Sequence, residues 1–201
     1  MSIGKRVALM SKGTKIGFIT EDESDYLTII EIIRKITGDF GIASERCYGK
    51  GCGKIKRKAV AWINVLVKKG CNSVILIHDA DKNDHEILRR DLRIIIEGSV
   101  GVSKFVCVPR EELEAWLLSD LSAIAATFSM KKRVKEISNP ESIVNPKEYI
   151  ARYVRDGTGH EKQYVNTRHN VKIAKAMNIK NLEKCSEFKS LKDHLFKILY
   201  K

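Results

Sequence analysis

A short apolar run that ends in acidic residues constrains the fold of this chain more than any other feature. Residues 74–77 are apolar and mostly β-branched, and Asp79 and Asp81 follow closely. A continuous apolar run of this length is typical of a strand covered on both faces, as in a parallel sheet. In open α/β sheets, ligands bind beyond the carboxyl ends of the strands. The two aspartates are therefore expected where such a fold binds its ligand.

The spacing of these two aspartates suggests a metal site. Alternate residues of an extended segment point the same way, so Asp79 and Asp81 could aim two carboxylates at one point. Hard oxygen ligands in that arrangement suit Mg²⁺ or Mn²⁺. The alternative is a structural turn, because Asp side chains bond their own backbone and tolerate turn geometry. The motif D-A-D-K-N-D taken alone leaves both interpretations open.

Strand-like and helix-like segments alternate along the first part of the chain. Strands are expected at 15–20, 42–48, 73–79 and 104–108, with 6–10 as a hairpin partner of the first, and helices at 26–36, 55–69, 83–97 and 109–120. This order predicts an α/β fold with a mostly parallel central sheet and helices on both faces. We place this α/β domain at residues 1–128. Residues 129–201, with helices expected at 146–155, 167–177 and 182–200, are predicted to form a small helical C-terminal extension packed on it.

Acidic residues follow other predicted strands as well. Glu21 stands at the end of 15–20, and Glu112 and Glu114 come just after 104–108. The carboxyl ends of parallel strands share one edge of a sheet, so these side chains are expected on the same rim as Asp79.

Some neighbouring acids have a simpler explanation. Glu23 and Asp25 lie at a helix start, where carboxylates cap naturally. Glu111 falls in the expected first turn of another helix, where it would favour the helix dipole without any further function.

The charge of the chain favours a polyanionic partner. The formal net charge is +12, and residues 41–70 carry eight Lys or Arg against one acid. A basic rim beside an acidic centre suits an enzyme that binds nucleic acid, since the rim can hold phosphates. The candidate nucleic-acid contacts are Lys50, Lys54, Lys56, Arg57 and Lys58. A solvated basic loop is the alternative, and the pattern of a Walker phosphate loop is absent.

Bulk properties exclude several classes of protein. No apolar stretch is long enough to span a bilayer, and the N-terminal residues lack the apolar core of a secretory signal. Five cysteines in a chain of 201 residues do not look like a disulfide framework. We therefore expect a cytoplasmic protein with reduced thiols and no membrane partner.

Two sets of motifs resemble known families. The segments I-T-E-D-E-S-D (with Glu21) and L-I-H-D-A-D (with Asp79 and Asp81) resemble the Toprim fold of topoisomerases, bacterial primases and several nucleases. More narrowly, the chain resembles the Toprim-like DUF4276 family. That resemblance rests on E-L-E-A-W-L-L-S-D at 112–120, N-P-K-E-Y-I at 145–150 and C-S-E-F-K-S-L at 185–191. One departure is Asp22, which stands where Toprim proteins usually have Gly.

The resemblance implies a function as well as a fold. It implies that Asp79 and Asp81 hold Mg²⁺ or Mn²⁺, with Glu21 as ligand or general acid/base. Glu112 and Glu114 match the acidic motif of the narrower family and are expected as further metal ligands. The activity implied is a divalent-metal-dependent nuclease acting on DNA or RNA, with a role in phage defence beside an ATPase partner.

Other functions compete with this one. The same basic surface could serve a non-catalytic module that binds nucleic acid or a partner protein. A phosphotransferase of the haloacid-dehalogenase type also uses D-x-D after a strand, but Asn83 stands where Thr or Val would be expected. A topoisomerase or a primase is not expected, because 201 residues leave no room for a strand-passage domain and no zinc-ribbon pattern stands before the predicted fold.

Overall fold

The computed structural model describes residues 14–38, 42–49, 52–99, 101–131 and 136–200. The described residues form one parallel sheet of four strands in the order β2-β1-β3-β4. The strands are β1 (Lys15–Thr20), β2 (Ala43–Tyr48), β3 (Ser73–Ile77) and β4 (Ser103–Cys107). Every neighbouring pair runs parallel, so the predicted sheet is confirmed. The segment 6–10, predicted as a hairpin partner, lies outside the described residues.

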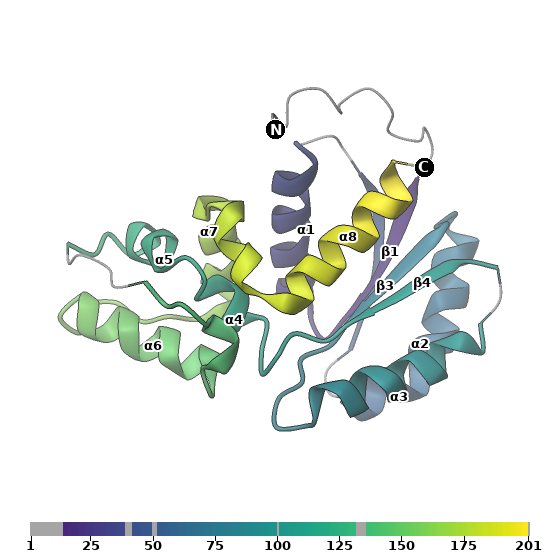
Figure 1. Ribbon diagram of the computed structural model, residues 1–201, viewed down its shortest axis with the longest axis horizontal. Coiled ribbons are helices and arrows are strands. Elements are labelled where there is room, and N and C mark those ends of the chain that lie inside the picture. The colour runs from purple at the N-terminus through teal and green to yellow at the C-terminus, as the bar shows by residue number, and fades with distance from the viewer. Residues whose placement is uncertain (1–13, 39–41, 50–51, 100, 132–135, 201) are drawn as a thin grey trace.

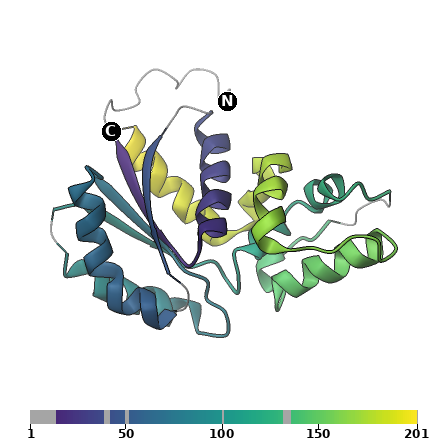
Figure 2. The same cartoon turned by 180° about the vertical axis from the view of Figure 1, so that it is seen from behind.

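Helices cover both faces of this sheet, as Figures 1 and 2 show. One face carries α1 (Glu23–Thr37) and α8 (Ser186–Leu199), and the other carries α2 (Cys52–Lys68) and α3 (His85–Glu97). Each layer has its own apolar core. Ile29 and Ile33 of α1 belong to the first, and Ile63 and Leu66 of α2 to the second. The α/β fold class predicted from the sequence is therefore confirmed.

A second group of helices lies beside the sheet (Figure 1). It comprises α4 (Glu114–Leu117), α5 (Leu121–Thr127), α6 (Pro146–Gly157) and α7 (Asn166–Ala176), with short 3₁₀ turns η2 (Pro140–Ser142) and η3 (Ile179–Lys184). Ile173 of α7 and Phe188 of α8 join the same apolar core as Ile29 of α1. The C-terminal helices thus pack directly on the α/β layer, and the division at residue 129 stays a prediction.

The strand β3 owes its central place to its composition. All five of its residues are buried, and it pairs with β1 on one side and β4 on the other. A strand covered on both faces favours apolar residues at every position, which is why residues 74–77 show no alternation with polar residues.

The helix predicted at 109–120 is wrong over its first half. The helix α4 begins only at Glu114, and Glu111 lies before it with a φ of 59°. The reason is that the backbones after β3 and β4 continue to bond to one another beyond the strands. The amide of Ala80 donates to the Pro109 carbonyl at 3.1 Å, and the amide of Asp81 donates to the Glu111 carbonyl at 2.7 Å. Glu111 therefore lies in a loop, where its carbonyl accepts the bond from Asp81, and it is not in the first turn of a helix.

Two further local predictions are corrected. The helix expected at 182–200 is divided at Cys185, which lies in extended conformation between η3 and α8. Asn145 precedes α6 as predicted, but it has a φ of 53° and forms no side-chain cap bond, while Pro146 does occupy the first turn. Among the described residues, no helix combines the length and the apolar character that crossing a bilayer requires.

Candidate functional site

Acidic side chains from three adjacent strands gather at the carboxyl edge of the sheet. Glu21 directly follows β1, Asp79 and Asp81 follow β3, and the acids after β4 lie near the start of α4. Because β1, β3 and β4 are neighbours in a parallel sheet, their carboxyl ends share one edge. We call the following residues the acidic cluster: Glu21, Asp22, Asp25, Asp79, Asp81, Glu112 and Glu114.

Glu21 lies beside Asp79, although the two are far apart along the chain. The amide of Asp79 donates a hydrogen bond to Glu21 Oε1 at 3.3 Å. His78 Nδ1 lies 3.0 Å from the same oxygen and 2.6 Å from the Asp79 carbonyl. Both partners are acceptors, so we assign the proton of the His78 ring to Nδ1. A single His at a strand end predicts no particular role, whereas in the structure His78 orients Glu21.

The carboxyl group of Asp79 lies at the centre of the acidic cluster. Its Oδ1 accepts a hydrogen bond from the Leu113 amide at 2.9 Å, which ties the end of β3 to the loop before α4. Loss of hydration raises the pKa of Asp79 well above its usual range, and neighbouring carboxylates raise it further. Those carboxylates are, in decreasing order of effect, Glu114, Asp25, Glu21 and Asp81. This edge of the sheet therefore favours a bound cation or proton.

Asp25 belongs to the cluster in addition to capping α1. Asp22 and Asp25 form a reciprocal capping box, with Asp25 N donating to Asp22 Oδ1 at 3.0 Å and Asp22 N to Asp25 Oδ2 at 3.3 Å. Burial, followed by the charges of Asp22 and Glu114, raises the pKa of Asp25 to about 7. The capping role predicted for Asp25 is confirmed, and its electrostatic role was missed. Glu23, predicted for the same role, does lie in the first turn of α1, and its side chain pairs with Arg46 at 2.7 Å.

Asp81 does not continue the extended backbone that the sequence predicted. Its φ is 49°, so the chain turns there, and its side chain is exposed. The prediction that strand alternation aims Asp79 and Asp81 at one point is therefore wrong. The two carboxylates still interact, since Asp81 is among the charges that raise the pKa of Asp79.

Glu112 and Glu114 hold a lysine from the C-terminal helices. Lys147, in the first turn of α6, donates its amide to Glu112 Oε2 at 2.8 Å and its ammonium to Glu112 Oε1 at 3.3 Å. The same ammonium lies 3.9 Å from Glu114 Oε1. Burial alone would lower the pKa of Lys147, but Glu114 and Glu112 raise it above its ordinary value. Lys147 was not singled out from the sequence, because it lies on an element whose packing the sequence does not specify.

Two more residues of the C-terminal region fix Glu114, namely Asn170 of α7 and Tyr164 of the loop before it. The side chain of Glu114 is almost completely buried, and its Oε1 accepts bonds from Asn170 Nδ2 at 3.0 Å and the Tyr164 hydroxyl at 3.2 Å. Burial and Glu114 itself raise the pKa of Tyr164 far above its usual range, so the hydroxyl stays protonated and donates. Glu114 of α4 thus contacts Lys147 of α6, Asn170 of α7 and Tyr164 of the loop between these two helices.

The cluster fits a divalent cation in chemistry and charge. Its donors are all carboxylate oxygens, which suit Mg²⁺ or Mn²⁺, and the raised pKa of Asp79 reflects negative charge that a cation would offset. Within the described ranges, however, no group of three or more His, Cys, Asp or Glu side chains is arranged so that it could hold a metal ion. The predicted ligands Glu21, Asp79 and Asp81 would have to converge further, for example by rotation of the exposed Asp81 side chain.

Most of the predicted basic residues lie at the start of α2. Lys54, Arg57 and Lys58 are exposed, whereas Lys56 pairs with Asp91 at 3.6 Å. The helix α2 follows the carboxyl end of β2, and the Gly49 amide bonds to the Thr20 carbonyl at 3.3 Å, next to Glu21. These basic side chains therefore flank the same edge of the sheet as the acidic cluster. Lys50, the remaining predicted contact, lies outside the described residues.

Gly49 serves internal packing. A Cβ at this position would lie 2.8 Å from the Trp62 ring and 2.9 Å from Lys54 Cε. The space that its missing side chain leaves is filled by the protein itself. Gly49 is therefore explained by the packing of Trp62 and Lys54 against the backbone.

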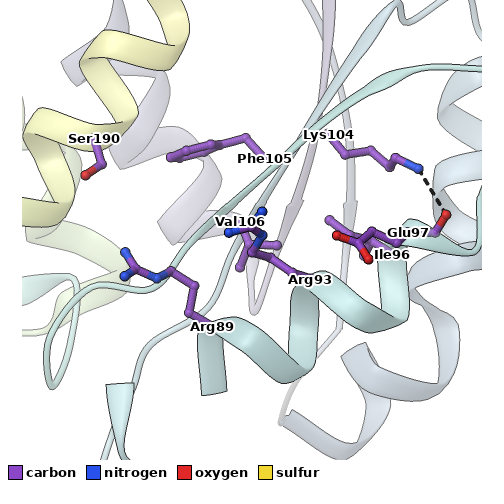
Figure 3. A pocket seen from close by; sticks show the side chains of 8 residues that line it. All are labelled: Arg89, Arg93, Ile96, Glu97, Lys104, Phe105, Val106 and Ser190. Carbon is purple, nitrogen blue, oxygen red and sulfur yellow. Dashed lines mark hydrogen bonds between the residues drawn. The ribbon is translucent and has the colours of Figure 1, made fainter. Parts of the chain in front are cut away.

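A separate groove of about 440 Å³ lies between α3, β4 and α8 (Figure 3). It contains no residue of the acidic cluster. Two of its cations are already engaged within the chain: Arg89 contacts Glu187 at 2.7 Å, and Lys104 donates to the Glu97 carbonyl at 3.4 Å. Among the described residues, Glu97 is the one acid that lines the groove, so the groove lacks the crowded carboxylates of the acidic cluster.

Comparison with known proteins identifies one related family. The family model described as "Domain of unknown function (DUF4276)" matches residues 20–195 of this chain. No curated protein and no solved structure matches this chain significantly. The match begins at the end of β1 and runs into α8, so it includes every member of the acidic cluster as well as Lys147, Tyr164 and Asn170.

Proposed function

The chain belongs to the DUF4276 family, and we propose that it is a divalent-metal-dependent nuclease that cleaves phosphodiester bonds in DNA or RNA. The observation that carries this proposal is the crowding of carboxylates around Asp79 at the carboxyl edge of the sheet, beside the exposed basic residues of α2. The order of Glu21 after β1 and Asp79 after β3 also resembles the Toprim fold, which supports the same chemistry.

In this proposal Glu21, Asp79 and Asp81 hold Mg²⁺ or Mn²⁺. A bound ion of this kind lowers the pKa of a water nucleophile and stabilises the leaving oxygen. Asp79 is held in place by the Leu113 amide. Glu21 is oriented by the Asp79 amide and His78, and is the candidate general acid/base. Glu112 and Glu114, the other predicted ligands, contact Lys147 and contribute to the charge of the site.

Substrate binding falls to the basic start of α2. Lys54, Arg57 and Lys58 present their charges to solvent near the cluster and can contact the phosphates of a nucleic-acid backbone. Such contacts position a substrate without reading its sequence, so they suit DNA and RNA equally.

A cleavage assay with purified protein tests the proposal. Labelled single-stranded and duplex DNA and RNA would be incubated with Mg²⁺, with Mn²⁺ or with chelator. We expect cleavage only with a divalent ion, and its loss in Asp79→Asn, which keeps the shape of the side chain and removes its charge. The control is Asp156→Asn, an exposed carboxylate in the last turn of α6. Equal cutting by the Asp79 and Asp156 variants would refute the assignment.

A second candidate is a non-catalytic module that binds nucleic acid or a partner protein. It is favoured by the finding that, among the described residues, no three or more His, Cys, Asp or Glu side chains are arranged so that they could hold a metal ion. Under this alternative the wild-type protein binds oligonucleotides equally well with chelator and with Mn²⁺, and cuts none of them. Binding without cutting under all metal conditions would decide for the module.

The resemblance also supports a biological setting. We propose a role in phage defence in which the protein acts beside an ATPase partner. Expression of the tagged chain in its host would test this. We expect ATPase activity to co-purify with the wild-type protein, and protection against phage to depend on Asp79.

A further inference from the structure

We propose that Lys147 contacts the substrate phosphate in the acidic cluster, as a cation that the C-terminal helices supply to the edge of the sheet. This inference rests on the proposed nuclease function and adds a residue that binds and orients the substrate. It also gives the helical C-terminal region a part in the site.

The position of Lys147 is fixed twice by the same carboxylate. Both oxygens of Glu112 are engaged by Lys147, one by its backbone amide at 2.8 Å and the other by its ammonium at 3.3 Å. Pro146 precedes it in the first turn of α6 and restricts the backbone there. The start of α6 is thereby held against the segment that follows β4, and the ammonium is directed toward the cluster.

The ammonium also lies close to the centre of the cluster. It is 3.9 Å from Glu114 Oε1. Leu113, the residue between Glu112 and Glu114, donates its amide to Asp79 Oδ1 at 2.9 Å. The lysine is thus connected to Asp79 through one short segment of chain, and the charge of Asp79 contributes to the raised pKa of Lys147.

Lys147 retains the freedom to bind a ligand. Its side chain is 42% exposed, while that of Glu114 beside it is 3% exposed. A lysine ammonium has three donors. Glu112 accepts one of them, and Glu114 is too distant at 3.9 Å for a strong hydrogen bond. A phosphate oxygen that approaches from solvent can therefore bind the ammonium without displacing Glu112.

A cation at this position suits the electrostatics of the site. A phosphodiester is an anion, and the acidic cluster would repel it. Among the described Lys and Arg side chains, Lys147 alone forms ion pairs with the cluster, through Glu112 and Glu114. A preorganised charge aimed at a phosphoryl group is a common means of stabilising the transition state of phosphoryl transfer.

The alternative is that Lys147 only neutralises the buried Glu114. Three variants separate the two roles: Lys147→Gln, Lys147→Arg and, as a control, Lys68→Gln. Lys68 is exposed at the end of α2, at the opposite edge of the sheet. The double variant Glu112→Gln/Lys147→Gln removes both charges of the pair and leaves neither partner unpaired. The test therefore does not depend on the single variant folding well.

We would measure oligonucleotide cleavage with Mn²⁺, oligonucleotide binding with Ca²⁺, and Mn²⁺ affinity by calorimetry. We expect Lys147→Gln to lower kcat/KM by about 100-fold and to weaken oligonucleotide binding by about tenfold. Lys147→Arg should restore most of both. Mn²⁺ affinity should stay equal or increase, because a competing positive charge has been removed.

Two results would overturn the inference. One is a Lys147→Gln protein that cleaves and binds oligonucleotides as well as Lys68→Gln does. The other is a loss of Mn²⁺ affinity in step with activity, as expected for Asp79→Asn, which would mark Lys147 as structural support only. Failure of the nuclease proposal is distinct, because the wild-type protein would then cut nothing with any metal. In that case the binding comparison alone decides whether Lys147 contacts phosphate.

Discussion

Asp25 illustrates how one side chain can serve both the fold and the site. Its carboxylate closes the capping box at the start of α1, and this role needs no functional site. The same carboxylate lies in the field of Asp22 and Glu114, and burial raises its pKa to about 7. An exposed carboxylate at this position would stabilise the helix at neutral pH. Ionising the buried Asp25 instead costs free energy, because it loses hydration and is repelled by Asp22 and Glu114.

That cost predicts a pH dependence of stability. Below pH 3.8 Asp25 is protonated in both the folded and the unfolded chain. As pH rises toward about 7 the unfolded chain releases this proton and the folded chain does not, so folding stability falls with rising pH. We expect the thermal midpoint of the metal-free protein to fall between about pH 4 and pH 7, and Asp25→Asn to reduce that fall. Thermal melts across this range, with Asp156→Asn as control, measure it.

The same experiment with Mn²⁺ tests the origin of the effect. A cation bound among ionised carboxylates should raise the midpoint more at pH 8 than at pH 5, because protons compete with the metal at the lower pH. If the thermal midpoint had the same pH dependence in the wild type and in Asp25→Asn, the ionisation of Asp25 would not be the cause of the loss of stability.

The contacts between elements explain how the C-terminal helix holds its place. Glu187 of α8 is buried and lies 2.7 Å from Arg89 Nη1, 3.2 Å from His85 Nε2 and 3.4 Å from the Val108 amide. The guanidinium of Arg89 on α3 and the amide that follows β4 thus meet one carboxylate of α8. Glu141 supports this junction from η2, since it accepts bonds from the Ser186 amide and hydroxyl at 3.0 and 2.9 Å.

Replacing Glu187 should therefore destabilise the fold. We expect Glu187→Gln to cost about 2 kcal/mol, because it takes the buried carboxylate from Arg89, which keeps only the exposed Glu86 as a charged partner. The control is Glu183→Gln, whose carboxylate pairs with Lys192 on the surface and should cost less than about 1 kcal/mol. Urea unfolding of both variants measures the difference. Equal loss of stability in the two would contradict a structural role for the buried pair.

Elements with a strong apolar pattern could be predicted from the sequence, and those that depend on loop contacts could not. The strand β3 was evident because it is apolar on both faces, and α1 because its apolar residues recur at helical spacing. The helix α4 was predicted to begin too early, because the hydrogen bonds from Ala80 and Asp81 to the loop after β4 hold that segment out of a helix. No local pattern encodes those bonds.

The site divides in the same way. Glu21 and Asp79 were predicted to meet because both follow strands of one parallel sheet, and their contact through the Asp79 amide follows from that topology. Lys147 could not be predicted, because it lies 35 residues beyond Glu112 on a helix whose docking depends on tertiary packing. His78 could have been suspected, since it directly precedes Asp79 at the end of the central strand.

For the whole molecule, the net charge of +12 predicts salt-sensitive binding to nucleic acid. If the start of α2 forms the contact, Lys54→Gln/Lys56→Gln/Arg57→Gln/Lys58→Gln should weaken binding. It should also reduce the slope of log K against log salt by about 0.9 for each lost phosphate contact. A matched control removes four exposed lysines from the C-terminal region: Lys172, Lys175, Lys180 and Lys189. Fluorescence anisotropy at several salt concentrations measures the affinity and the slope for both variants. Equal slopes in the two variants would exclude a contact localised at the start of α2.

The central claim is that carboxylates from separate strands bind a divalent ion at one edge of the sheet. The most direct measurement is a calorimetric titration of Mn²⁺ into the metal-free protein, into Asp79→Asn and into the exposed control Asp156→Asn. The account predicts saturable binding by the wild type and by Asp156→Asn, and its loss in Asp79→Asn. A wild-type protein that takes up no Mn²⁺, or an Asp79→Asn protein that binds it as tightly as the wild type, would contradict the account.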